Sequence, residues 1–130
     1  MKYEELMTLA KQGRGRAYAP YSGFSVGAAL LCSDGGVYTG SNIENSAFSP
    51  SVCAERVAVF SAVHDGKREF LAIAISGGDC GKEPSGFTPC GVCRQVLSEF
   101  SDGNLTVLVA KADGYDRYLL SELIPHSFGL

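Results

Sequence analysis

The sequence CAER at residues 53–56 and the sequence PCGVCR at residues 89–94 decide how this chain of 130 residues is interpreted. Together they hold three thiols and one carboxylate, and each is followed by apolar residues at helical spacing. A structural zinc ion usually has four protein ligands, whereas a catalytic zinc ion has three and leaves the fourth position to water. Cys53, Cys90 and Cys93 therefore predict a catalytic zinc site, with Glu55 as the base that serves the water.

The rest of the chain alternates between helical and extended patterns. Apolar residues at helical spacing predict one helix over residues 3–13, and two further helices begin near Cys53 and Cys90. Short runs of β-branched and small apolar residues predict five strands, at residues 24–32, 37–40, 71–75, 105–110 and 115–119.

The order of these elements predicts a three-layer α/β/α fold with a mixed five-stranded sheet. The strands at residues 71–75 and 105–110 are separated by a helix, which indicates a parallel pair joined by a crossover. Residues 112–114 are too short for a crossover, so the last two strands are expected to be antiparallel. Loops are predicted at residues 42–51 and 77–85. In this fold the two cysteine-bearing helices start side by side at one edge of the sheet, where their positive ends favour ionised thiols.

Composition and charge exclude several classes of protein. A chain of this length with 45% hydrophobic residues predicts a single domain over residues 1–130. The net charge of -3, with scattered basic residues, argues against a polymeric nucleic acid as partner. No signal-peptide pattern is present, and apolar runs such as residues 26–32 are too short to span a membrane. Five unevenly spaced cysteines indicate metal ligands or free thiols, so we expect a cytoplasmic protein.

The cysteines and the neighbouring arginines have alternative interpretations. A C-x-x-C pair also occurs in redox sites and in structural zinc knuckles. A closed four-cysteine site would need Cys32 or Cys80, although the first is predicted to be a core residue and the second an exposed thiol. Arg56 and Arg94 follow the two motifs, and either would offset the negative charge of three thiolates and a hydroxide or would be a solvated helix residue.

These motifs resemble those of a known family. CAER at residues 53–56, together with PCGVCRQ at residues 89–95, is similar to the cytidine deaminases of the small homotetrameric type. The similarity continues through YSGFSVGAA at residues 21–29, GSNIEN at residues 40–45 and LIP at residues 123–125, so it covers nearly the whole chain. It implies the cytidine deaminase-like fold, one zinc ion per subunit and the mechanism of the zinc deaminases.

The resemblance also implies a role for individual residues. The implied zinc ligands are Cys53, Cys90 and Cys93. The implied substrate-binding residues are Phe24 against the base, Asn42 and Glu44 at the ribose, and Ala54. Glu55 would transfer protons, Arg56 would lie next to the zinc ligands, and Phe128 would contact a neighbouring subunit's substrate. Phe48 stands where the family often has Tyr, and without the resemblance Asn42 and Glu44 are equally well explained as turn-stabilising residues.

The implied activity is hydrolysis of cytidine and deoxycytidine to uridine and deoxyuridine in pyrimidine salvage. A free nucleoside fits better than a nucleotide because the carboxylate of Glu44 only accepts hydrogen bonds and would repel a phosphate. The apolar tail at residues 123–130 is expected to dock onto another copy in a homotetramer. Two alternatives remain, a deaminase of a cytosine-containing nucleoside antibiotic and a zinc-stabilised binding module without catalysis.

Overall fold

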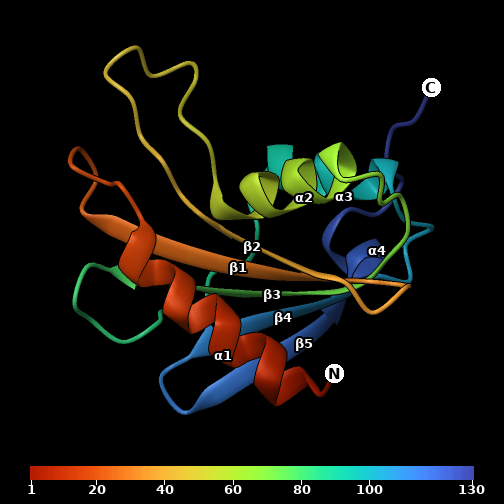
Figure 1. Cartoon of the computed structure of the whole chain (residues 1–130), viewed down its shortest axis with the longest axis horizontal. Helices are drawn as coiled ribbons and strands as arrows, with labels where there is room; N and C mark the ends of the chain where they lie inside the picture. Colours follow the sequence, from red (N-terminus) through yellow and green to blue (C-terminus); the bar gives the residue numbers. More distant parts are fainter.

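The computed structural model describes residues 1–130 and has a mixed five-stranded sheet with helices on both faces, as predicted (Figure 1). Its elements are, in chain order, α1 (Tyr3–Gly13), a 3-10 helix (Arg14–Arg16), β1 (Phe24–Cys32), β2 (Val37–Ser41), α2 (Ala54–His64), β3 (Phe70–Asp79), α3 (Gly91–Glu99), β4 (Thr106–Lys111), β5 (Gly114–Leu119) and α4 (Leu120–Leu123). None of the helices is both long and apolar enough to cross a membrane.

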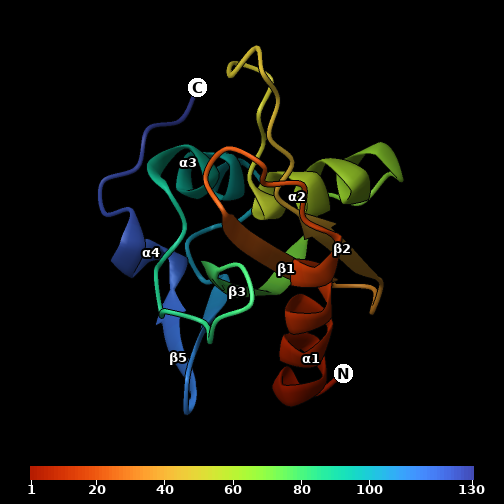
Figure 2. The same ribbon diagram turned by 90° about the vertical axis from the view of Figure 1, so that its left-hand side faces the viewer.

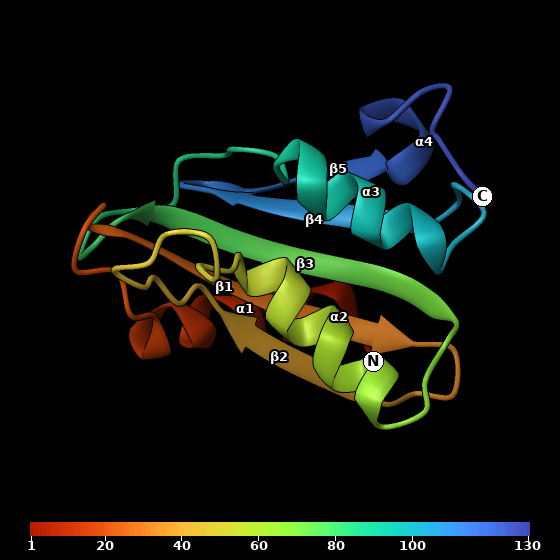
Figure 3. The same ribbon diagram turned by 90° about the horizontal axis from the view of Figure 1, so that it is seen from above.

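The strand order is β2-β1-β3-β4-β5, and only β3 and β4 run parallel to each other. The predicted parallel pair and the predicted antiparallel last pair are both confirmed. Helix α2 follows β2 and leads into β3, while α3 connects β3 to β4. Seen from above, α2 and α3 lie on the same face of the sheet (Figure 3), and α1 covers the opposite face (Figure 1). This topology brings the first residues of α2 and α3 to the same end of the sheet.

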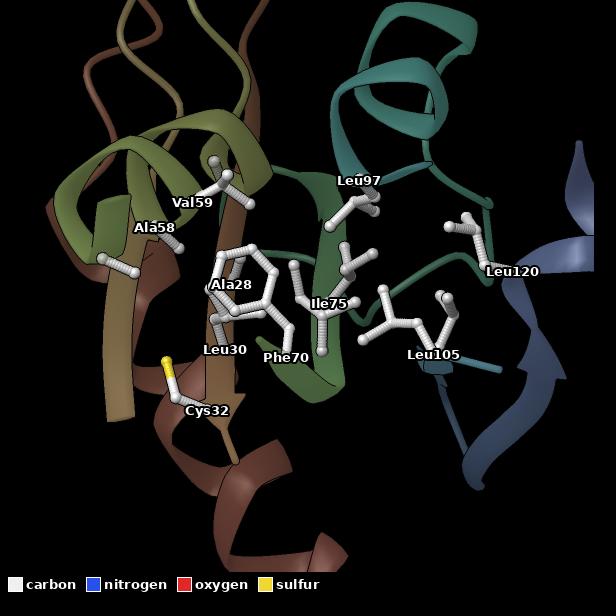
Figure 4. Close-up of a cluster of buried hydrophobic side chains, with 14 of the residues drawn as sticks. Ala28, Leu30, Cys32, Ala58, Val59, Phe70, Ile75, Leu97, Leu105 and Leu120 are labelled. Carbon is white, nitrogen blue, oxygen red and sulfur yellow. The ribbon is translucent and has the colours of Figure 1, made fainter. Parts of the chain in front are cut away.

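The core has one layer on each face of the sheet. Along β1, Ala28 and Leu30 point toward α2 and α3, whereas Ala29 and Leu31 point toward α1. Figure 4 shows the first of these layers, in which Leu97 of α3 reaches down toward the sheet. Because both faces are buried, β1 has no polar side chain from Val26 onward and does not alternate between apolar and polar residues.

Two glycines allow the helices to touch the sheet. A Cβ atom on Gly40 would lie 2.3 Å from the carbonyl oxygen of Ala54, the first residue of α2. A Cβ atom on Gly27 would lie 2.0 Å from the carbonyl oxygen of Ala10 in α1. Gly40 pairs with Ala28, the neighbour of Gly27, so the two contacts are adjacent on opposite faces. Gly40 therefore determines how closely the start of α2 approaches the sheet.

Two features differ from the sequence-based expectation. Strand β3 continues to Asp79, although residues 77–79 were predicted to belong to a loop. Gly77 pairs with Val26, and a Cβ atom on this glycine would lie 2.2 Å from the ring of Phe87. Glycine is therefore required here by packing within a strand. The four-residue helix α4 was also not predicted, because a single helical turn has no detectable periodicity.

Strand β5 forms one edge of the sheet and carries charged side chains. Asp116 forms an ion pair with Lys111 of β4, with the atoms 3.0 Å apart. The guanidinium of Arg117 lies 5.2 Å from the centre of the Tyr3 ring, within the range of a cation–π contact. No residue of β5 is buried. This edge of the sheet thus presents charged side chains beside tyrosines that pack against the core.

Candidate zinc site and active site

The three predicted ligand cysteines come together in the structure. The sulfur atoms of Cys53, Cys90 and Cys93 all lie within 4.8 Å of one another, and those of Cys53 and Cys90 are 3.9 Å apart. Zinc–sulfur bonds of about 2.3 Å in a tetrahedron separate two sulfur atoms by about 3.8 Å. The donor set therefore fits a zinc ion with one open position.

The other two cysteines do not belong to this group. Cys32 is buried in the core beneath α2 and α3, and Cys80 is an exposed thiol on the loop after β3, as the sequence predicted for each. A closed site with four cysteines is thus not formed. A redox pair made only of Cys90 and Cys93 would not explain why Cys53 lies against them.

The main chain holds Cys53 in place. This residue is the N-cap of α2 and has an extended backbone. Val52 and Ile43 exchange two backbone hydrogen bonds of 2.9 and 3.0 Å, and the next residue, Glu44, donates its N–H to the carbonyl of Tyr18 at 2.8 Å. A ladder of backbone bonds therefore runs from residue 18 to the residue that precedes Cys53.

The second pair of cysteines begins α3 in a similar way. Cys90 is the N-cap residue and is exposed, while Cys93 lies in the first turn and is fully buried. Both helices thus direct their N-termini at the thiols, as predicted, and this orientation favours the ionised form that binds metal. The preceding residues, Thr88 and Pro89, make no backbone–backbone hydrogen bond.

The two arginines that follow the motifs have different partners. The guanidinium of Arg56 donates to the sulfur of Cys53 at 3.2 Å, which fits the expected offset of thiolate charge. Arg94 instead donates to the carbonyl of Pro89 at 2.7 Å, the hydroxyl of Thr88 at 2.6 Å and the carbonyl of Leu123 at 2.6 Å. The structure therefore brings Arg56 to a thiol and Arg94 to the backbone.

The thiols and Arg56 shift one another's pKa values. A hydrogen bond from Cys93, together with the charge of Arg56, lowers the pKa of Cys53 to about 5 against the opposing effect of burial. The same hydrogen bond and burial raise the pKa of Cys93. Burial alone would lower the pKa of Arg56, but its hydrogen bonds with both thiols raise it. The sulfur of Cys53 thus lies beside a permanent positive charge that stabilises its ionised form.

Glu55 lies in the first turn of α2, next to Cys53 in sequence, and is only 2% exposed. Burial raises the pKa of its carboxyl to about 7, and the nearby charge of Cys53 acts in the same direction. A carboxyl with such a pKa both accepts and donates protons near neutral pH. Its oxygens are not among the mutually close ligand atoms, so Glu55 lies outside the group of three sulfur atoms that could hold a metal.

Asn42 and Glu44 hold the turn that leads into Phe24. The side-chain oxygen of Asn42 accepts a hydrogen bond from the N–H of Val26, and its nitrogen donates to the carbonyl of Phe24, both at 2.8 Å. The carboxylate of Glu44 accepts from the N–H of Ser22 at 3.1 Å and also from the hydroxyl of that residue. These bonds, the one from the hydroxyl first, lower the pKa of Glu44. Glu44 is therefore an ionised acceptor.

The remaining predicted residues occupy different surroundings. Phe24 makes an edge-to-face contact with Phe87, with ring centres 5.0 Å apart, and sequence reasoning missed this partner. The available signal was an aromatic residue inside an otherwise polar loop. Ala54 is fully buried, so only its backbone N–H, which makes no hydrogen bond within the chain, is free for a ligand. Phe48 and Phe128 are 72% and 68% exposed, respectively.

Comparison with known proteins places this geometry in a family. Residues 1–109 match the model of the cytidine and deoxycytidylate deaminase zinc-binding region. A cytidine deaminase of Sporosarcina psychrophila is 45% identical over 129 residues, which is 98% of this chain and 92% of that protein. A cytidine deaminase of Halalkalibacterium halodurans is 42% identical over 129 residues, 98% of this chain and 95% of that protein.

Solved structures show the same fold. The crystal structure of cytidine deaminase from Burkholderia pseudomallei has a TM-score of 0.89 and 40% identity, and the match covers 98% of this chain and 100% of that one. The structure of cytidine deaminase from Mycobacterium tuberculosis has a TM-score of 0.83 and 37% identity, over 100% of this chain and 99% of that one. Because the family model covers most of the chain and relatives match it over nearly its whole length, this chain belongs to the cytidine deaminase family.

Proposed function

We propose that this chain is a zinc-dependent hydrolase that converts cytidine and deoxycytidine to uridine and deoxyuridine with release of ammonia, as a step of pyrimidine salvage. The observation that carries the proposal is the cluster of three sulfur atoms within 4.8 Å of one another beside the buried carboxyl of Glu55. Relatives that match over nearly the full length of the chain are named cytidine deaminases, which supports the same substrate.

The metal would be one zinc ion per subunit, held by Cys53, Cys90 and Cys93. Bound at such a site, zinc lowers the pKa of a water molecule to about 7 and so supplies the nucleophile near neutral pH. The guanidinium of Arg56 stays beside Cys53 and offsets the negative charge of the sulfur ligands.

Glu55 would perform the proton transfers. Its carboxylate accepts a proton from the attacking water and delivers it to N3 of the cytosine ring, which makes C4 more electrophilic. The remaining proton of the attacking water then passes through the same carboxyl to the amine at C4, and the C–N bond breaks as ammonia leaves. A pKa of about 7, set by burial, suits a group that must accept and release protons in one cycle.

We infer that Phe24, Asn42, Glu44 and the backbone N–H of Ala54 bind the nucleoside. Glu44 is ionised and half exposed, so its carboxylate is available to sugar hydroxyls and would repel a phosphate. Asn42 holds the backbone of Phe24, which supports a fixed position for the base-contacting ring. The ring of Phe87 supports Phe24 from the side.

We propose that the enzyme is a homotetramer in which a neighbouring subunit closes each site. Phe48, Val92 and Phe128 are large apolar side chains that are more than half exposed, and Val92 lies between two of the thiols in sequence. A site that excludes water needs cover over such groups. Residues 1–130 would form one catalytic domain in each subunit, because both layers of the core pack on the same sheet.

Deletion of residues 126–130 should raise KM or lower kcat while zinc content stays near that of the full chain. The reason is that Phe128 would contact the substrate of another subunit and lies outside the ligand set. Steady-state kinetics and metal analysis on the truncated protein measure both quantities, with sedimentation velocity as a check on assembly. Unchanged kinetics, or a fully active monomer, would remove the support for this role.

We propose a cytoplasmic location on the basis of the thiols. All five cysteines are unpaired, and three of them must stay reduced to bind metal. Such a set of thiols persists in a reducing compartment and is oxidised in a secretory one.

The proposed function is tested by following the loss of ultraviolet absorbance when purified protein is mixed with cytidine. We expect turnover that stops after treatment with a zinc chelator and returns when zinc is restored. Ammonia released from a cytosine-containing nucleoside antibiotic, but not from cytidine, would favour the alternative deaminase. Bound zinc without any ammonia release would show a binding module.

A further inference from the structure

The segment that leads into Cys90 is held by one side chain. Thr88 and Pro89 make no backbone–backbone hydrogen bond, although Pro89 is fully buried. The three nitrogen atoms of the Arg94 guanidinium each donate one hydrogen bond, and two of these reach Thr88 and Pro89 at 2.6 and 2.7 Å. Arg94 thus replaces the backbone ladder that would otherwise fix this segment.

The third bond of Arg94 reaches the C-terminal part of the chain. It goes to the carbonyl of Leu123, the last residue of α4, at 2.6 Å. The next residue of α3, Gln95, donates to the carbonyl of Phe128 at 2.9 Å. Figure 2 shows the tail rising beside α3, where these bonds hold it. The same guanidinium therefore ties the Cys90 segment to the end of α4.

We propose that Arg94 is a positioning residue that holds Cys90 in place for zinc by joining the carbonyl of Pro89 to the carbonyl of Leu123. This inference rests on the proposed zinc-dependent function. Arg94 acts through the backbone and has no role in the chemistry. It differs from Arg56, which contacts a sulfur atom directly and offsets charge.

The chemistry of arginine suits this role. A guanidinium is planar and presents five N–H groups in a fixed fork, so one side chain can serve three acceptors in different directions. A lysine has a single ammonium on a flexible stem and cannot reproduce that geometry. Cys90 is exposed and the two residues before it lack backbone bonds, although its own carbonyl accepts the backbone N–H of Arg94 at 2.9 Å. Loss of the Arg94 side chain therefore frees the segment before Cys90, so that this ligand can move relative to the metal.

The experiment compares zinc release from wild type, Arg94→Gln, Arg94→Lys and the matched control Arg68→Gln. Arg68 also donates to two backbone carbonyls at a helix end, those of Val63 and Lys67 at 2.7 and 3.0 Å, but lies at the opposite end of α2 from the thiols. Zinc-loaded protein is mixed with a chromogenic chelator, and the release rate is recorded under conditions where every variant is folded. Partners outside the ligand set typically change metal affinity by about 10–100-fold.

We expect Arg94→Gln to release zinc at least about tenfold faster than wild type. Arg94→Lys should recover only part of this loss, and Arg68→Gln should release zinc at the wild-type rate. Reconstitution with Co²⁺ provides a second readout, because the intensity of the thiolate-to-cobalt absorption reports how many sulfurs remain bound. We expect a weaker band for Arg94→Gln and an unchanged one for Arg68→Gln.

Several outcomes would overturn the inference. Wild-type release and a wild-type cobalt spectrum in Arg94→Gln would do so, as would equally fast release from Arg68→Gln. If Arg94→Gln does not fold, Arg94→Lys is the second variant, because a single ammonium cannot serve the carbonyls of both Pro89 and Leu123. Wild-type release from Arg94→Lys would then count against the proposal. Wild-type protein that takes up no zinc would instead overturn the proposed function itself.

Discussion

The two sides of the candidate zinc site are supported in different ways. The Cys53 side, residues 52–56, follows a backbone bridge between Val52 and Ile43 that is extended to Tyr18. The Cys90 side, residues 88–93, begins with Thr88 and Pro89, which make no backbone–backbone hydrogen bond and are bonded by the side chain of Arg94. Both sides nevertheless present an N-cap cysteine at the start of a helix.

This difference determines which substitutions each side tolerates. A backbone ladder survives most side-chain changes, because its donors and acceptors belong to the main chain. A segment held by one guanidinium loses its support with a single substitution. The Cys53 side is also the side that carries Glu55, whose carboxyl must keep a fixed position for proton transfer. The half of the site with backbone support therefore contains the carboxyl that we propose as the proton carrier.

The largest effect should come from removing a ligand on either side. Cys53→Ser and Cys90→Ser should each weaken zinc binding by more than about 100-fold, because changes outside the ligand set already cost 10–100-fold. Activity should fall with the metal, and the thermal midpoint should drop. Metal analysis after dialysis measures the loss, with Cys80→Ser as the matched control that keeps its zinc. Metal loss in Cys80→Ser would restore the closed-site interpretation.

The second effect separates chemistry from metal binding on the Cys53 side. Glu55→Gln should lower kcat by about 10²–10⁴-fold, the usual contribution of a general acid–base. Zinc content should stay at the wild-type level, because Glu55 lies outside the group of ligand atoms. Parallel measurement of turnover and bound zinc tests this. A variant that loses its zinc would show that Glu55 belongs to the metal site.

The third effect concerns how closely the start of α2, which carries Cys53 at its N-cap, packs on the sheet. Gly40→Ala places a Cβ atom 2.3 Å from the carbonyl of Ala54 and should destabilise the protein by about 1–3 kcal/mol through overpacking. Gly91 occupies the start of α3, and a Cβ atom there has no neighbour within 4 Å. Gly91→Ala should therefore leave the free energy of unfolding unchanged or raise it slightly. Urea unfolding of both variants measures the two free energies of unfolding. Equal decreases would mean that the starts of α2 and α3 are packed equally closely.

The smallest effect lies at the far end of α2, away from the thiols. Lys67 and Asp34 form an exposed ion pair, which lowers the pKa of Asp34 and raises that of Lys67. A lowered carboxyl pKa adds stability above the unfolded value of about 3.9, and this is lost as pH falls through the folded value. Asp34→Asn should therefore melt slightly below wild type at neutral pH, and the difference should vanish in acid. A difference that grows in acid would contradict this assignment.

Much of the fold could be predicted because its apolar patterns are strong. The run from Phe24 to Cys32 and the helical spacing after Cys53 appear in the structure with nearly the predicted bounds. The predicted loop at Gly77 was wrong, because the sequence does not distinguish a glycine in a turn from a strand glycine that makes room for the ring of Phe87. Helix α4 is one turn long and depends on the side chain of Glu122, which accepts from the N–H of Leu119 at 2.8 Å.

The candidate site was predictable to a different degree. Spacing and residue type were sufficient to predict that Cys53, Cys90 and Cys93 come together, because metal chemistry restricts the choice of ligands. The catalytic role of Glu55 stays a prediction. The partners of Arg94 could not be predicted, since two of them are carbonyl groups that every residue possesses. The residue type of a partner does not reveal that its backbone carbonyl accepts a hydrogen bond.

The charged edge of the sheet has a consequence for how copies of this chain meet. An uncovered edge strand can pair side by side with strands of other copies, and charged side chains such as Asp116 and Arg117 make that growth into aggregates unfavourable. The exposed apolar side chains Phe48, Val92 and Phe128 lie outside β5. Contacts through these side chains can form closed assemblies of limited size, whereas continued strand addition would form fibres. The charged side chains of β5 therefore oppose pairing through this strand, which would leave the exposed apolar residues as the contact surface of the homotetramer that we propose.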